Sequence, residues 1–431
     1  MKILPIAVTA LSLAISGLVH ADDNEYILYQ EGTGNTASGD QSDPTIFNNL
    51  IDQTQIGDNN DADAAQTNGN TNGVIIQYQE GNNNTSLADQ DATTDSTSEA
   101  YLTGDDNNSD TSQTSTSNST ISVFVTGNSN NAGGTQDITS DTSLIITIEG
   151  DNNIVSPLQE NVSNSLMNFT FVGDGNIGSS LQENSDSATL ISETYGDDNV
   201  VTTTQADSSS TTVLIFQTGN SNLGATGDQD GSANNTGTIT QVGNSNTGVF
   251  ARFTSFSQST TIDQFGDSNL TDTSATDSSN STGIVLQQGD GNISATLLQT
   301  VSDNSYNVSQ IGDGNFAFLT QSGSSHTAEI IQMSDLNEIN ADQQSFDNDL
   351  YSLQNGEDNL INSLQDGDIE TATLNQVGTL NEIDLTQSGQ QDIATLSQDG
   401  NNNFLMVTQT GFSDTINVTQ LGNNNSATYM Q

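Results

Sequence analysis

The chain has 431 residues, of which 31% are hydrophobic and 5% aromatic. That share is too small for the compact cores that two or three ordinary globular domains would need. Its 55 acidic residues face only Lys2 and Arg252, so plain repulsion excludes nucleic acid and anionic membrane surfaces as partners. Without any Cys, the chain cannot be stabilised by disulfides.

The first 21 residues are typical of a signal peptide. Lys2 supplies the positive charge, residues 3–18 are largely apolar, and cleavage is predicted after Ala21. The apolar stretch is short for a membrane-spanning helix and no second run of spanning length follows it. We therefore expect an exported protein without membrane insertion, in which residues 22–29 form a short N-terminal leader.

The rest of the chain is built from one repeated unit. The pattern Gly-x-x-Asn, as in Gly378 to Asn381, recurs eighteen times, and only at Ser334 is the Gly replaced. We assign repeats of about 23 residues to 30–309 and regular repeats of 22 residues to 310–431. Disorder would suit the polar composition, but a disordered tract has no physical reason to keep a period.

Within each unit, apolar and polar residues alternate. Ile383, Leu385 and Gln387 share one parity, while Glu382 and Asp384 have the other, and a period of two indicates strands of five or six residues. Segments rich in Gly and polar residues lie between them and are typical of turns. The sequence therefore predicts an all-β protein, a β-solenoid of about 18 stacked strand-turn-strand rungs roughly 4.8 Å apart.

Stacked rungs place equivalent amides above one another, where each can bond the next and so avoid the cost of an unpaired buried amide. The predicted amide ladder comprises Gln30, Asn35, Gln41, Gln55, Asn60, Gln66, Gln310, Asn315, Gln321, Gln332, Asn337, Gln343, Gln354, Asn359, Gln365, Gln376, Asn381, Gln387, Gln398, Asn403, Gln409, Gln420, Asn425 and Gln431. The predicted turn glycines are Gly32, Gly57, Gly312, Gly356, Gly378, Gly400 and Gly422.

The ladder is interrupted in the middle of the chain. The first glutamine of five consecutive units is replaced by Leu102, Val125, Ile148, Phe171 and Thr194. The second glutamine of four later units is replaced by Asp228, Arg252, Ala275 and Leu298. Two interpretations stay open: drift among tolerant central rungs, or a weakened middle that leaves 310–431 as the block best suited to assembly.

No catalytic, cofactor-binding or metal-binding residues are predicted. His326 has no Cys and no second His after Ala21 with which to form a triad or a zinc site. An Asp follows the turn glycine in many units, and stacked carboxylates could attract Ca²⁺, although solvated turn residues that slow premature stacking explain them as well. These aspartates are Asp58, Asp105, Asp151, Asp174, Asp197, Asp267, Asp290 and Asp313.

The unit QxGxxNxAxxxQ resembles the curlin-associated repeat of curli fimbriae. Gln310, Gly312, Asn315, Ala317 and Gln321 match it letter for letter, as do the units that begin at residues 30, 55 and 420. The resemblance implies a functional amyloid that polymerises with identical subunits on a nucleator. It also implies export through an outer-membrane pore with periplasmic accessory proteins, and a bacterial cell-surface fibre that serves adhesion, aggregation and biofilm matrix. An ice-binding solenoid, for which no regular outward Thr row is apparent, and a monomeric exported β-solenoid adhesin remain alternatives.

The charge generates the first testable prediction. If copies stack, like charges are brought together, and salt shortens the range of their repulsion from about 30 Å at 0.01 M to about 8 Å at 0.15 M. We expect the lag before fibres of the mature chain appear to shorten as sodium chloride is raised over this range, measured by thioflavin fluorescence. A lag that is indifferent to ionic strength would show that charge does not slow assembly.

Overall fold

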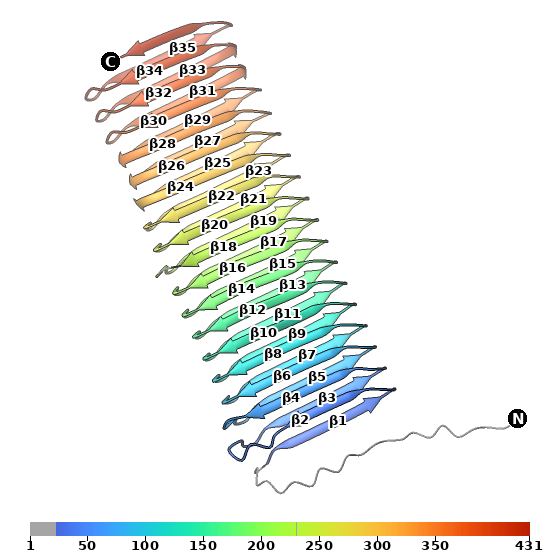
Figure 1. The fold of residues 1–431 in the computed structure, drawn as a ribbon. Coiled ribbons are helices and arrows are strands. Elements are labelled where there is room, and N and C mark those ends of the chain that lie inside the picture. The colour runs from blue at the N-terminus through green and yellow to red at the C-terminus, as the bar shows by residue number, and fades with distance from the viewer. Residues whose placement is uncertain (1–22, 230) are drawn as a thin grey trace, which may run out of the picture.

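The computed structural model describes residues 23–229 and 231–431. The predicted signal peptide, residues 1–21, lies outside the described residues, as does the first residue of the predicted leader. The described chain consists of strands and turns and includes no helix long and apolar enough to cross a membrane. The predicted fold is confirmed: the protein is a parallel β-solenoid of about 18 rungs that rises steadily from the N-terminal to the C-terminal end (Figure 1).

Each rung contributes one strand to each of two sheets. The first sheet contains β1 (Glu25–Glu31), β3 (Leu50–Ile56), β5 (Val74–Glu80), β7 (Thr97–Thr103), β9 (Thr120–Thr126), β11 (Ser143–Glu149), β13 (Leu166–Val172), β15 (Thr189–Tyr195), β17 (Thr212–Thr218), β19 (Thr236–Val242), β21 (Ser259–Phe265), β23 (Thr282–Gln288), β25 (Ser305–Ile311), β27 (Thr327–Met333), β29 (Asp349–Asn355), β31 (Thr371–Thr379), β33 (Ile393–Asn401) and β35 (Thr415–Leu421). The second sheet contains β2 (Thr36–Asp40), β4 (Asp61–Thr67), β6 (Thr85–Asp91), β8 (Asn108–Thr114), β10 (Asn131–Asp137), β12 (Ile154–Glu160), β14 (Ile177–Glu183), β16 (Val200–Ala206), β18 (Leu223–Gln229), β20 (Thr247–Phe253), β22 (Leu270–Thr276), β24 (Ile293–Ser302), β26 (Phe316–Ser324), β28 (Glu338–Phe346), β30 (Leu360–Gln365), β32 (Glu382–Gln387), β34 (Phe404–Gln409) and β36 (Ser426–Met430).

Each strand from β1 to β34 pairs in parallel with the strand two places further along the chain, and the register places equivalent residues together. In the pairing of β31 with β33, for example, Gln376 lies opposite Gln398. Most strands have seven residues, not the five or six predicted from the sequence. The parallel pairing does not stop at the inward glutamine but includes the outward residue that follows it. In β31, for example, Val377 pairs with Asp399, so the strand is longer than predicted.

The interior is a thin layer between the two sheets. The second, fourth and sixth residues of a typical strand point inward, as in β11, where Leu144, Ile146 and Ile148 are at most 1% exposed. Apolar residues form three separate clusters along the solenoid. Buried amides and hydroxyls occupy the remaining inward positions, so the small apolar content of the chain is enough for this fold.

The first turn of each rung depends on its glycine. The seven predicted turn glycines have φ between 100° and 131°, a backbone conformation that residues with a side chain rarely adopt. At Gly378, a Cβ would also overlap the carbonyl oxygen of Gly400 in the next rung. Ser334, the one exception, has φ 73° and so turns the chain with a different backbone conformation.

This geometry predicts that Gly378→Ala lowers the free energy of unfolding by at least about 2 kcal/mol, because the backbone is strained and the added Cβ meets the next rung. Gly227→Ala is the matched control, since a Cβ at Gly227 would meet nothing within 4 Å. Denaturant unfolding of the folded mature protein checks both variants, and the control should change by no more than about 0.5 kcal/mol. Equal losses for the two variants would contradict this account of the turn.

Candidate functional site

The inward glutamines form hydrogen-bonded columns along the solenoid. Gln376 Nε2 donates to Gln398 Oε1 at 3.0 Å and to the carbonyl oxygen of Leu360, in the opposite sheet, at 2.9 Å. Each such amide therefore joins two rungs and also ties one sheet to the other. Both amide hydrogens are used, which removes most of the cost of burying the group.

The structure places the predicted glutamines in two columns, one in each sheet. The first-sheet column holds Gln30, Gln55, Gln310, Gln332, Gln354, Gln376, Gln398 and Gln420, with amide-to-amide distances of 2.7–3.0 Å. The second-sheet column holds Gln41, Gln66, Gln321, Gln343, Gln365, Gln387 and Gln409, with distances of 2.7–3.2 Å. Gln431, the last predicted member, follows β36 and is exposed, although its backbone N–H donates to the carbonyl oxygen of Thr408 at 2.9 Å and so continues the pairing beside Gln409.

The asparagines form a third column at the first turn. The backbone N–H and the Nδ2 of Asn381 both donate to Asn359 Oδ1 at 3.1 Å, and Nδ2 donates to the carbonyl oxygen of Gly400 at 2.8 Å. The side chain thus bonds the rung on each side of it. The predicted column contains Asn35, Asn60, Asn315, Asn337, Asn359, Asn381, Asn403 and Asn425.

The family comparison fits this geometry. The model of the curlin associated repeat matches residues 302–333 and 378–411. The chain carries curlin associated repeats. No curated protein matches the chain in a sequence search. The rungs outside the two matched segments keep the same strand register and the same first-turn glycine and asparagine columns.

In the rungs that lack the first glutamine, apolar side chains fill the interior. Leu102, Val125, Ile148 and Phe171 are at most 2% exposed and belong to one apolar cluster, in which the rings of Phe169 and Phe171 pack edge to face. Thr194 ends this run and donates its hydroxyl to Gln217 Oε1 at 3.2 Å. These rungs replace amide bonding with hydrophobic burial.

The second interruption contains a buried ion pair that the sequence did not reveal. Asp228 and Arg252 lie in register on β18 and β20, each 1% exposed, with Oδ1 and Nη1 3.5 Å apart. Burial raises the pKa of Asp228 and lowers that of Arg252, and the attraction between the two charges opposes both shifts. The alignment of Asp228 and Arg252 in one ladder position was the only signal that could have found the pair.

The surroundings satisfy this pair incompletely. Arg252 Nη2 donates to the carbonyl oxygen of Thr236 at 2.8 Å and the guanidinium lies 4.6 Å from the centre of the Phe250 ring. Arg252 Nε and Nη1 and Asp228 Oδ2 make no hydrogen bond with any residue that the structure describes. The neighbouring Tyr306 is buried, and this burial raises its pKa to about 12. The rungs around Arg252 thus contain a buried ion pair whose hydrogen-bonding capacity is only partly used.

The turn aspartates are hydrogen-bond acceptors between rungs. The backbone N–H of Asp151 donates to Asp174 Oδ1 at 2.7 Å, and that of Asp174 donates to Asp197 Oδ1 at 2.9 Å. These carboxylates therefore accept hydrogen bonds that join neighbouring rungs, a structural role that was not predicted from the sequence. Among the described residues, no group of three or more His, Cys, Asp or Glu is arranged to hold a metal ion.

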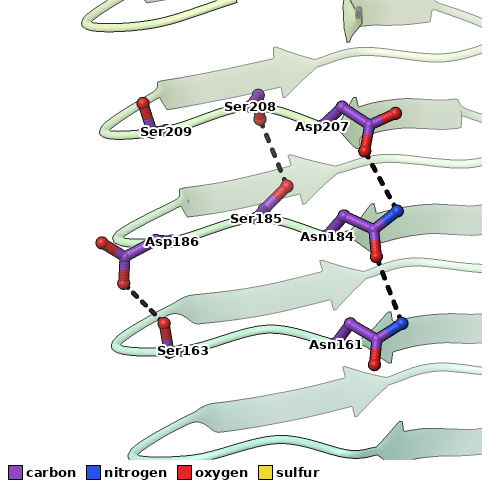
Figure 2. A pocket seen from close by; sticks show the side chains of 8 residues that line it. All are labelled: Asn161, Ser163, Asn184, Ser185, Asp186, Asp207, Ser208 and Ser209. Atoms are coloured by element: carbon purple, nitrogen blue, oxygen red, sulfur yellow. Dashed lines mark hydrogen bonds between the residues drawn. The ribbon is translucent and has the colours of Figure 1, made fainter. Parts of the chain in front are cut away.

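The second turn has a shallow hollow that spans three rungs (Figure 2). Asn161 Nδ2 donates to Asn184 Oδ1 at 3.1 Å, and Asn184 Nδ2 donates to Asp207 Oδ1 at 3.0 Å. Ser163 donates to Asp186 Oδ1 at 2.6 Å, and this bond is the main cause of a lowered pKa of Asp186. The polar side chains of the hollow thus extend the hydrogen bonding between rungs.

His326 is a structural residue of the second turn. It is fully buried, its Nδ1 lies 3.3 Å from the backbone nitrogen of Asn348, and its Nε2 lies 3.2 Å from the carbonyl oxygen of Ser322. Burial lowers its pKa, so the neutral ring is favoured, with Nε2–H as donor and Nδ1 as acceptor. Fold and family together point to a structural protein.

The ion pair leads to a prediction about stability. Arg252→Ala should lower the free energy of unfolding by about 3–5 kcal/mol, because it leaves Asp228 buried without a counter-charge. The double variant Asp228→Gln with Arg252→Gln continues the second-sheet column from Gln205 and should recover most of that loss. Denaturant unfolding of both variants and of Asp228→Gln alone measures the difference. A double variant as unstable as Arg252→Ala would show that the position does not accept an amide.

Proposed function

We propose that the mature chain is a secreted structural subunit of extracellular curli-like amyloid fibres, which grow by end-on addition of identical copies. The fibres mediate cell adhesion, aggregation and biofilm matrix at the bacterial surface. The observation that carries the proposal is that the two ends of the solenoid are unpaired and complementary in their hydrogen-bonding groups. The curlin repeats support the same assignment.

The N-terminal end exposes residues that belong to the interior. Tyr26 and Leu28 on β1 are 41% and 44% exposed, although they lie in register with Ile51 and Gln53, which are fully buried. They are exposed because no rung precedes β1 among the described residues. At the other end, Tyr429 on β36 is 45% exposed for the same reason. A second copy that continues the rungs would bury these side chains.

Each amide column has a direction, so it ends in a donor at one end of the solenoid and in an acceptor at the other. Along the glutamine columns, Nε2 of each amide donates to Oε1 of the next rung toward the C-terminus, so Gln420 has a spare N–H and Gln30 has a spare Oε1. The asparagine column runs in the opposite sense, from the N–H of Asn425 to Asn403 Oδ1. Its terminal acceptor, Asn425 Oδ1, would meet the N–H of Asn35 in another copy.

Head-to-tail contact is therefore favoured over contact between two like ends. Such a contact is heterologous and does not close on itself, so it produces a filament. Parallel pairing of β35 with β1 of the next copy would place Gln420 on Gln30 and Val418 on Leu28, in the register found within the chain. Identical subunits are the proposed partners. A nucleator, an outer-membrane export pore and periplasmic accessory proteins are proposed on the family resemblance alone.

The two alternative functions, an ice-binding solenoid and a monomeric adhesin, would require different features of the outer surface. The structure aligns one row of hydroxyls that the sequence reading missed, at the first residue of the first-sheet strands: Thr97, Thr120, Ser143, Thr189, Thr212, Thr236, Ser259, Thr282, Ser305 and Thr327. Leu166 interrupts it. The next outward position is mixed, with Glu99, Ser122 and Ile145, so no flat array of neighbouring hydroxyl rows forms there. A monomeric adhesin would leave the apolar ends uncovered.

End-on growth predicts that preformed fibres remove the lag of the mature chain, and that Leu28→Lys slows seeded elongation by at least about tenfold. The lysine charge would have to enter the new interior formed between copies, where an unpaired charge is costly. Ile27→Lys is the matched control, because Ile27 is 42% exposed on the same strand but faces outward. Thioflavin fluorescence with sonicated seeds measures both rates. A chain that stays folded, soluble and unseedable would instead support the monomeric adhesin.

A further inference from the structure

The second turn changes its character in the last rungs of the solenoid. The fully buried residue that precedes the first-sheet strand is Asn304, His326, Asn348, Glu370 and Asp392 in successive rungs. Asn348 acts there as the asparagines do at the first turn: Nδ2 donates to the carbonyl oxygen of Gly367 at 2.9 Å, and Oδ1 accepts the N–H of Glu370 at 2.9 Å. Glu370 and Asp392 take the same place with carboxyl groups, which have no donor when ionised.

Glu370 and Asp392 each have one carboxyl oxygen close to the carbonyl oxygen of a glycine in the next rung. A Cβ built on Gly367 would overlap both Glu370 Oε1 and the carbonyl oxygen of Gly389, so these two oxygens lie beside the same point. A Cβ on Gly389 would likewise lie against Asp392 Oδ2 and the carbonyl oxygen of Gly411. A protonated carboxyl has a hydrogen to donate toward the neighbouring carbonyl oxygen, and an ionised carboxylate has none.

The hydrogen bonds that do form are unequal. Glu370 Oε1 and Oε2 accept the N–H groups of Gly389 and Gly367 at 2.9 and 3.1 Å. Asp392 Oδ1 accepts the N–H of Asp414 at 2.9 Å, while its Oδ2 is buried without a hydrogen-bond partner in the described part of the chain. Asp392 thus lacks the one bond that the Nδ2 of an asparagine would make in this position.

We propose that Glu370 and Asp392 form a proton-operated latch, in which each protonated carboxyl donates to the glycine carbonyl of the next rung as an asparagine amide does. The proton comes from solvent and leaves to solvent, and no other group changes. The latch is independent of fibre formation, since it acts within one solenoid. It lies next to the C-terminal end, where we propose that copies add.

The charges around the latch favour the protonated state. Asp366 and Asp368 lie in the turn of Glu370, Asp414 lies in the next rung beyond Asp392, and Asp347 and Asp349 flank the preceding rung. The basic group of this column is His326, two rungs away, which burial keeps neutral. Burial raises the pKa of Glu370 to about 7 and also raises that of Asp392, with nearby acids adding to both shifts.

The direction of the pH effect follows from these shifts. A carboxyl whose pKa is higher in the folded than in the unfolded chain stabilises the fold fully below the unfolded pKa, near 4.5. That stability is lost as the pH rises through the folded pKa of about 7. The last rungs should therefore be more stable against local unfolding at pH 5 than at pH 8.

Hydrogen exchange of the folded mature chain tests the latch. Between pH 5 and pH 8, protection of amides in 367–421, corrected for intrinsic exchange, should fall by at least about tenfold, which corresponds to one pKa unit. Amides in 50–103 serve as the internal reference and should change little.

Isosteric variants separate the latch from general charge effects. Glu370→Gln with Asp392→Asn supplies permanent donors and should make the protection of 367–421 independent of pH. Glu357→Gln with Asp399→Asn removes the same charge from exposed positions of these rungs and should keep the fall. The proposal is overturned if the amide variant loses protection as the unaltered chain does, if the exposed pair abolishes the fall, or if calcium at pH 8 restores protection, since a cation would then occupy the site.

Discussion

The structure depends on the hydrogen bonds that join each rung to the next in register. Because equivalent residues lie directly above one another, a buried amide finds its partner in the same residue of the neighbouring rung. Gln376 bonds Gln398 in this way and also reaches across to the carbonyl of Leu360. This allows a chain with few apolar residues to build a buried interior, since the amides that would otherwise be costly to bury form the hydrogen bonds that hold the two sheets together.

The same dependence explains how the solenoid tolerates its irregular rungs. Replacing glutamines by Leu102 to Phe171 removes the donor and the acceptor of each amide together, so hydrophobic burial takes the place of hydrogen bonding there. The pair of Asp228 and Arg252 is different, because two charges are buried with several atoms unpartnered. The apolar clusters divide near this point, between Ile262 and Ala275. The middle of the solenoid is thus held by a different balance of forces from its ends.

A finite ladder always leaves its last groups without a partner, and this connects fold to proposed function. The spare N–H of Gln420 and the spare Oε1 of Gln30 are consequences of stopping a repeating structure. Their opposite character gives the stack a polarity, which a polymer of identical copies would inherit. The acids at the second turn show the converse case, in which Glu370 and Asp392 break the pattern of donors close to the C-terminal end and make it sensitive to protons.

The sequence by itself determined the fold class, the two-strand rung, and the glycine and asparagine positions of the first turn, because a strict period forces equivalent residues into equivalent environments. It could not decide the strand length, since outward residues such as Val377 carry no inward pattern, or that Gln431 falls beyond the last strand. Only the tertiary structure brought Arg252 onto Asp228, aligned the hydroxyl row of the first sheet, and placed Glu370 where Asn348 stands one rung earlier. The place of Glu370 depends on the register at the variable second turn, where the sequence has no constant residue to count from. The ion pair and the hydroxyl row depend on which side chains the stacked strands bring together, and the period alone does not show that.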